Sequence, residues 1–126
     1  MGDDKIAFFS SPNLIDWTHL SDFGPHGATG GCWECPDLFP LTTPSGEEKW
    51  VLLVSLNPGG IAGGSGTQYF IGDWDGTYFT TTQSEAQWID YGRDNYAGVT
   101  FYNAPDNRRI FIGWMSNWDY AAKLPS

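Results

Sequence analysis

Hydrophobic residues in this chain lie in short runs that are separated by glycine, proline, asparagine and aspartate. No run repeats its apolar positions with the period of a helix, and the runs are rich in β-branched and aromatic residues, which favours strands. Residues 50–56 (WVLLVSL) are apolar at nearly every position, as expected for a strand that is covered on both faces. Residues 109–115 (RIFIGWM) show the same pattern. The chain is therefore predicted to be all-β.

Turn-forming residues between these runs predict that consecutive strands are antiparallel neighbours. Turn signals occur at 43–46 (TPSG), at Asp75-Gly76 and at 105–107 (PDN). We expect strands over 37–41, 50–56, 68–73 and 78–82, a glycine-rich loop over 57–66, and a second series that begins with 97–103 and 110–115.

A group of four antiparallel strands that begins again after roughly sixty residues indicates blades of a β-propeller, with a sandwich as the alternative. Residues 5–20 (KIAFFSSPNLIDWTHL) would form outer strands of a preceding blade, with a turn at Ser11-Pro12-Asn13. The chain would then hold about two blades, whereas a propeller needs at least four to close. Its first and last blades would each lack a neighbour, so we expect the isolated chain to be poorly stable.

Charge and composition narrow the choice of ligand. Six basic and fifteen acidic residues give a formal net charge of -9 and a pI near 4.2, which argues against nucleic acid and anionic membranes as partners. The acids are scattered, so most of them are expected on a solvated surface. Seven Trp, six Tyr and eight Phe supply flat apolar faces on which sugar rings can stack, although most aromatic residues of a β protein lie in its core. A neutral ligand fits this chain best.

The sequence contains no apolar run that is long enough to cross a membrane. Its first residues, MGDDKIAFFSS, have neither the basic region nor the apolar region of a secretory signal. We therefore expect no export signal in this chain, and the signal of a secreted parent protein would lie outside it. Localisation stays open.

The segment 30–37 (GGCWECPD) carries the most informative acid. Glu34 is flanked by Trp33, two cysteines and a proline at the entrance of a strand, whereas exposed acids are usually surrounded by polar residues. A carboxyl that packs against an indole and thiols is desolvated, which favours its protonated form and suits a general acid. An ordinary acid at the end of a strand is the alternative.

Cys32 and Cys35 form a C-x-x-C pair, which also occurs in zinc and redox sites. Zinc would need two further ligands, but the chain has no other cysteine, and His19 and His26 lack the spacing of paired ligands. A thioredoxin-type motif belongs at a junction between a strand and a helix. We therefore expect no metal and no cofactor, and two thiols packed in the core.

Several motifs follow one another in an order that resembles glycoside hydrolase family 32, the invertases, inulinases, levanases and fructan exohydrolases. They are 10–17 (SSPNLIDW), 34–39 (ECPDLF), 55–60 (SLNPGG) with 63–65 and 68–70, 90–97 (DYGRDNYA) and 112–120 (IGWMSNWDY). Together they cover nearly the whole chain, and their common order makes the resemblance far more specific than any single motif.

The resemblance implies a five-bladed propeller with a funnel-shaped active site on its axis and a retaining mechanism run by two carboxylates. Glu34 would be the general acid/base, and Cys35 would lie behind it. Retention requires a second carboxyl roughly 5 Å away as the nucleophile. The family's nucleophile motif W-M-N-D-P-N-G and its R-D-P motif are absent here. The chain therefore resembles an internal fragment, 1–126, that comprises the end of blade 2, blade 3 and much of blade 4, and we expect it to be inactive alone.

The resemblance implies further contacts with a carbohydrate substrate. Trp118, with Asn117 beside it, would line the fructose subsite, and Asp94 with Tyr96 would support the acid/base side of the funnel. Trp33 would contact the ligand beside the acid. A place in the core for Trp33 and Trp118, and loop capping for Asp94, are the alternatives.

Three hypotheses follow for function. The first is a segment of a hydrolase that cleaves sucrose or fructans such as inulin and levan, completed by blades that this chain lacks. The second is a non-catalytic or vestigial sugar-binding module. The third is a redox or zinc protein built on Cys32 and Cys35. The sequence favours the first and does not choose between sucrose, inulin and levan, between exo and endo action, or between hydrolysis and fructosyl transfer.

Overall fold

The computed structural model describes residues 4–123. Residues 1–3, which begin the stretch in which we expect no export signal, lie outside this range. The described residues form antiparallel sheets and two short 3-10 turns, η1 (Pro105–Asn107) and η2 (Ala121–Lys123), with no α-helix among them. The strands are β1 (Ile6–Ser10), β2 (Thr18–Phe23), β3 (Cys32–Thr42), β4 (Glu48–Asn57), β5 (Gly66–Trp74), β6 (Phe79–Thr80), β7 (Gln87–Trp88), β8 (Tyr96–Phe101) and β9 (Ile110–Trp114). The prediction of an all-β chain is confirmed. No helix of the described part is long and apolar enough to cross a membrane.

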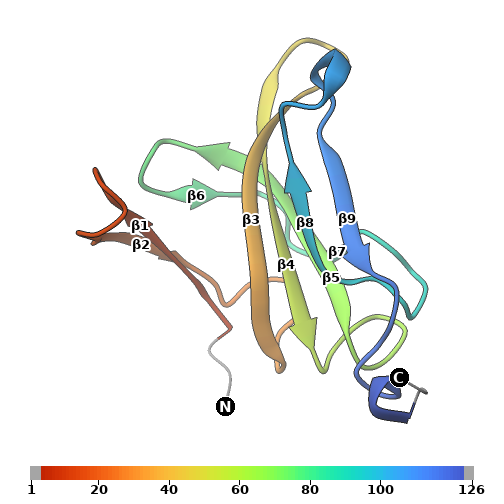
Figure 1. Cartoon of the computed structure of the whole chain (residues 1–126). Helices are drawn as coiled ribbons and strands as arrows, with labels where there is room; N and C mark the ends of the chain where they lie inside the picture. Colours follow the sequence, from red (N-terminus) through yellow and green to blue (C-terminus); the bar gives the residue numbers. More distant parts are fainter. Residues whose placement is uncertain (1–3, 124–126) are drawn as a thin grey trace.

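The central sheet has the order β3-β4-β5-β6, and β7 pairs with β5. The hairpin β1–β2 lies on one side of this sheet and the hairpin β8–β9 on the other (Figure 1). The predicted turns are present: the Gly46 N–H donates to the Thr43 carbonyl at 2.9 Å, and the Asp75 carboxylate accepts from the N–H groups of Thr77 and Tyr78 at 2.8 and 2.7 Å. The first of these turns joins the antiparallel neighbours β3 and β4, and the second joins β5 and β6, as the sequence predicted. Among the described residues, β2 does not pair with β3 and β7 pairs with β5, so the prediction does not hold for every consecutive pair of strands.

Strand β4 is covered on both faces, which confirms the prediction for 50–56. Leu52, Val54 and Leu56 face one side and join a core cluster with Ile6 of β1. Val51 and Leu53 face the other side, where Phe39 and Phe111 pack against them. Each fully buried aliphatic side chain contributes about 1.5–3 kcal/mol to folding. The central sheet is therefore held by both flanking hairpins.

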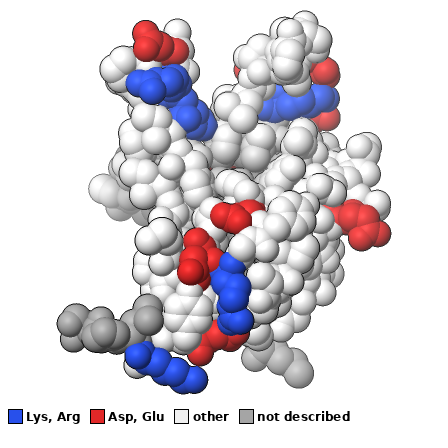
Figure 2. Space-filling model, turned by 90° about the vertical axis from the view of Figure 1, so that its right-hand side faces the viewer, with Lys and Arg blue, Asp and Glu red and all other residues white. Residues whose placement is uncertain are grey.

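Strand β9 differs from its prediction, because only one of its faces is covered within residues 4–123. Phe111 packs against the central sheet, whereas Ile112 is 60% exposed and the following Met115 is 84% exposed. Figure 2 shows this side of the molecule, and most of its surface carries no charge. The expectation of a strand covered on both faces is wrong here, because no further strand of the described chain packs against the outer face of β9.

Strand β3 of the central sheet and strand β8 of the β8–β9 hairpin carry matching irregularities. In β3, Glu34 pairs with Ser55 and Asp37 with Leu53, so two residues, beginning with Cys35, lie opposite one. Cys35 has a φ of 47°, and Pro36, which has no N–H to donate, fits such a bulge. Because the bulge lets β3 pair with β4 on both sides of Pro36, β3 begins at Cys32 rather than at the predicted Asp37. In β8 an equivalent bulge begins at Ala97, whose φ is 52°.

Candidate active site

The two bulged strands bring Glu34 and Tyr96 together. Each residue directly precedes the bulge of its strand, and the Tyr96 hydroxyl donates a hydrogen bond to Oε2 of Glu34. Glu34 is exposed, so within the described residues its carboxyl is not desolvated by packing against Trp33 and the thiols, contrary to the prediction from the sequence. Its carboxyl nevertheless points at a specific donor from the neighbouring sheet, which distinguishes it from an ordinary acid at the end of a strand.

Tyr96 is buried, and its environment keeps it in the neutral form. Burial raises the pKa of its hydroxyl, and the hydrogen bond to Glu34 raises it further. The phenol therefore stays protonated across the neutral range. It can serve as a permanent hydrogen-bond donor to one oxygen of the Glu34 carboxyl.

The two cysteines beside Glu34 are free and exposed, so the expectation that both thiols pack in the core is wrong. Partial burial and, after it, the charge of Glu34 raise the pKa of Cys35, which keeps it as a thiol near neutral pH. Among residues 4–123, no group of three or more His, Cys, Asp or Glu side chains is arranged to hold a metal ion. Cys35 thus lies next to the acid, as the family resemblance implied, and acts there as a neutral neighbour.

Aromatic rings continue the site from Tyr96 towards the end of β9. The Tyr96 and Trp114 rings are 6.3 Å apart, and the Trp114 and Trp118 rings are 5.1 Å apart with an interplanar angle of 55°. Trp118 is 55% exposed, which favours the prediction of a ligand contact over a place in the core. Sequence reasoning missed Trp114, although it pairs across the strands with Tyr96 and so shares its face.

Trp33 does not lie on this surface. Its side chain is 7% exposed and packs against Phe23 and Phe70, and its Nε1 donates to the Ala28 carbonyl at 3.0 Å. Neighbouring residues of a strand point to opposite faces, so Trp33 enters the core while Glu34 points away from it. The expected ligand contact of Trp33 is therefore corrected to a core position.

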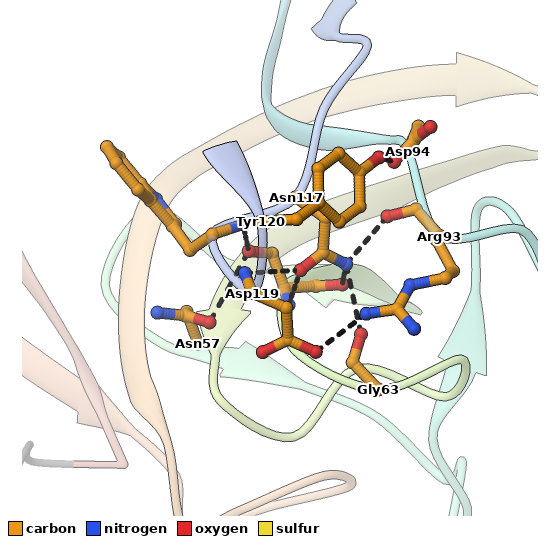
Figure 3. A network of polar contacts seen from close by, with 9 residues as sticks. Asn57, Gly63, Arg93, Asp94, Asn117, Asp119 and Tyr120 are labelled. Atoms are coloured by element: carbon orange, nitrogen blue, oxygen red, sulfur yellow. Dashed lines mark hydrogen bonds and ion pairs between the residues drawn. The ribbon is translucent and has the colours of Figure 1, made fainter. Parts of the chain in front are cut away.

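Asn117 and Asp94 belong to a polar network between three loops (Figure 3). Asn117 is fully buried and all its hydrogen bonds are made to backbone groups, so it has no atom left for a ligand. Asp94 is exposed and accepts a hydrogen bond from the Tyr120 hydroxyl. Beside it, Arg93 and Asp119 form an ion pair of 2.7 Å.

A second acid of β3 lies on the same face as Glu34, two register positions further along. This is Asp37, whose Oδ2 accepts hydrogen bonds from the backbone N–H and the hydroxyl of Thr100 at 2.7 and 2.6 Å. The Thr100 hydroxyl in turn accepts a hydrogen bond from Arg109 at 2.9 Å. Asp37 therefore links β3 to β8. Glu34 is the carboxyl that is available for chemistry beside the rings of Tyr96, Trp114 and Trp118, which we call the aromatic row.

Comparison with known proteins gives the same picture over the whole chain. Residues 2–126 match the model of the glycosyl hydrolases family 32 N-terminal domain. The levanase of Bacillus subtilis strain 168 is 48% identical over 130 residues, which cover 98% of this chain and 19% of the levanase. The extracellular exo-inulinase of Aspergillus awamori is 47% identical over 132 residues, 97% of this chain and 25% of that protein. The chain thus spans about a fifth to a quarter of the length of these relatives.

Solved structures agree with this match. The crystal structure of exo-inulinase from Aspergillus awamori superposes with a TM-score of 0.89 at 44% identity, covering 98% of this chain and 26% of that one. The fructofuranosidase of Schwanniomyces occidentalis, solved in complex with fructose, gives a TM-score of 0.85 at 40% identity over 93% of this chain and 23% of that one. The antiparallel sheets are therefore parts of a β-propeller, and the chain belongs to glycosyl hydrolase family 32.

Proposed function

We propose that this chain is a segment of a retaining β-fructofuranosidase that cleaves sucrose or fructans, and that Glu34 is its general acid/base. The contact between Glu34 and Tyr96 beside an exposed aromatic row is the observation that carries this proposal. The names of the relatives support the substrate class: levanase, exo-inulinase and, in Schizosaccharomyces pombe, an invertase that is 42% identical over 123 residues.

In this proposal the chain supplies only some of the blades. The hairpin β1–β2 is the end of blade 2, β3 to β6 form blade 3, and β8 with β9 is the first half of blade 4. The nucleophilic carboxylate comes from sequence that this chain does not contain. The uncovered face of β9 and the exposed apolar residues of the β1–β2 hairpin are where the other blades would pack.

Glu34 acts twice in the reaction. In the first step the nucleophile attacks the anomeric carbon of the fructosyl unit, the glycosidic bond breaks, and protonated Glu34 gives its proton to the leaving oxygen. In the second step the Glu34 carboxylate takes a proton from water, whose oxygen attacks the fructosyl-enzyme and frees the nucleophile. Because Tyr96 donates to Oε2, Oε1 is the oxygen that carries the proton.

The residues around Glu34 have separate roles in binding. Trp118, with Trp114 behind it, offers the sugar ring a flat apolar face. Asp94, held by Tyr120, is the polar group at the rim of the same side. Tyr96 orients the acid rather than the sugar.

A chimeric enzyme tests the proposal. This chain replaces the matching segment of the Bacillus subtilis levanase, which supplies the remaining blades, and hydrolysis of levan and sucrose is measured; we call this protein the levanase chimera. Glu34→Gln should lower turnover by about a hundredfold or more and leave KM nearly unchanged, because it removes the transferable proton. Glu48→Gln, at an exposed position of β4, is the control and should have no effect.

The isolated chain should not hydrolyse either sugar, because it lacks the nucleophile. Sucrose cleavage by the pure chain that disappears in Glu34→Gln would contradict this assignment of roles. A chimera that folds but does not turn over, and that still binds fructose, would favour the sugar-binding module instead.

A further inference from the structure

We propose that Asn117 is a positioning residue: its buried amide holds three loops in one arrangement and so fixes the aromatic row that leads to Glu34. The inference rests on the proposed function for its effect on catalysis, but not for its structural core. The three loops are 57–66 between β4 and β5, 90–95 before β8, and 116–120 after β9 (Figure 3).

The amide of Asn117 matches its surroundings in a way that no other side chain of that size would. Its Oδ1 accepts hydrogen bonds from the N–H groups of Ser65 and Asp119 at 3.2 and 3.0 Å. Its Nδ2 donates to the carbonyl oxygens of Arg93 and Gly63 at 2.8 and 3.0 Å, and lies 3.4 Å from that of Ser65. A primary amide has two acceptor sites and two donor hydrogens, so all of them are used.

Burial makes the loss of any of these hydrogen bonds costly. Asn117 is fully buried, and a buried polar group that loses its partner keeps the full cost of its desolvation. An apolar side chain in its place would leave backbone groups of all three loops without a partner. A carboxylate would place negative charge against three carbonyl oxygens. The network therefore depends on the amide and not only on the volume of the side chain.

The loop 57–66 is shaped to fit this amide. A Cβ at Gly64 would lie 2.1 Å from Oδ1 of Asn117, so the backbone of the loop reaches the amide only because residue 64 has no side chain. The φ of Gly64 is 66°, which favours glycine for a second reason. Gly64, one of the glycines that mark this loop in the sequence, thus allows the close approach to Asn117.

The network continues to Trp118 and from there to the acid. The Trp118 N–H donates to the Ser65 hydroxyl at 3.0 Å. Ser65, whose own N–H is bonded to Asn117, therefore also fixes the backbone of Trp118. The ring of Trp118 packs on Trp114, which packs on Tyr96, which donates to Glu34. A shift of the 116–120 loop would therefore move the sugar-binding face relative to the proton donor.

Two substitutions of Asn117 in the levanase chimera separate positioning from simple stability. Asn117→Ala should lower kcat/KM by about tenfold to a hundredfold per folded molecule, as expected when groups around a substrate are misplaced by about 1 Å. Asn117→Asp should cause a similar loss at neutral pH and regain part of the activity at acidic pH, because a protonated carboxyl can donate one hydrogen bond to the Arg93 carbonyl.

The charged groups around the amide make this pH test interpretable. Arg93 and Asp119 pair with each other, Asp94 is bonded to Tyr120, and the 57–66 loop contains no titratable residue. Asp119→Ala is the control, since it removes an exposed ion pair but keeps every bond to the amide, and its kcat/KM should stay within about twofold.

The result can contradict the inference in two ways. If Asn117→Ala lowers only the melting temperature, with kcat, KM and pH profile unchanged, Asn117 is merely structural. If Asn117→Asp shows the same pH profile as Asn117→Ala, the amide's donor role is wrong. Either result would leave the proposed function intact, provided that Glu34→Gln still lowers the turnover of the chimera by about a hundredfold or more.

A spectroscopic measurement keeps the inference testable if the unsubstituted chimera is inactive, an outcome that would overturn the proposed function. The close pair Trp114 and Trp118 contributes to the near-UV circular dichroism, and Trp118→Phe identifies that contribution by difference. Asn117→Ala should remove the same signal and Asp119→Ala should keep it. An unchanged signal in Asn117→Ala would overturn the positioning role.

Discussion

Replacing Tyr96 with phenylalanine removes one hydroxyl and keeps a buried ring in contact with Trp114. The lost interaction is a hydrogen bond from a neutral phenol to Oε2 of Glu34. Negative charge builds on Glu34 as its proton moves to the leaving oxygen, so the bond is stronger in the transition state of this first step than in the substrate complex, where Glu34 is still protonated. A hydrogen bond to a charged group contributes about 1.5–3 kcal/mol. Since about 1.4 kcal/mol corresponds to a factor of ten, kcat should fall by about tenfold to 150-fold.

Steady-state kinetics of the levanase chimera on sucrose test this value. KM should change little, because the bond to a neutral carboxylic acid in the bound substrate complex is weaker than the bond to a carboxylate. Tyr91→Phe is the matched control, since Tyr91 lies exposed in the loop before β8, and it should leave kcat unchanged. An unchanged kcat in Tyr96→Phe, or a loss seen in KM alone, would refute the role that we assign to this hydroxyl.

Other outcomes follow from burial and charge. The Cys35 thiol should react with iodoacetamide more slowly than free cysteine near neutral pH, because burial and the charge of Glu34 raise its pKa; Glu34→Gln should speed the reaction, whereas Glu48→Gln should not. Phe70→Ala should lower the free energy of unfolding of the chimera in urea by about 3–5 kcal/mol, because Phe70 is fully buried. Ile112→Ala should cost about 2–4 kcal/mol in the chimera, where a further blade covers β9, and a loss below about 0.5 kcal/mol would show that this face stays open.

The strands were predictable where burial and turn chemistry act locally. Residues 50–56 are apolar on both faces because both flanking hairpins cover β4, and the turns at 43–46 and 75–76 require the glycines and the aspartate that mark them. The two-residue strand β7 (Gln87–Trp88) was missed, because it is too short to show a period and exists only through its pairing with β5. The outer face of β9 was mispredicted, since a sequence pattern shows which residues are suited to burial and not what covers them.

The site was predictable where a motif carries it and unpredictable where it depends on contacts between separate sheets. Glu34 stands out by its neighbours in sequence, but its contact with Tyr96 joins residues from two sheets. Trp33 and Asn117 were expected at the ligand, because both lie in motifs next to site residues. Alternation along β3 turns Trp33 into the core, and the glycine-rich loop, far away in sequence, encloses Asn117.

The side chains of Glu34 and Tyr96 are both oriented by a β-bulge in their own strand. Each directly precedes a bulge whose first residue, Cys35 or Ala97, adopts a left-handed conformation that costs a non-glycine residue roughly 1–2 kcal/mol. The Ser55 hydroxyl supports one of them, since it accepts a hydrogen bond from the Ala97 N–H at 3.1 Å while Ser55 itself pairs with Glu34 across β3 and β4. Regular pairing would instead continue both strands without the kink that re-aims a side chain. The strain is thus located where strands of two different sheets meet, and Ser55 couples the two bulges to each other.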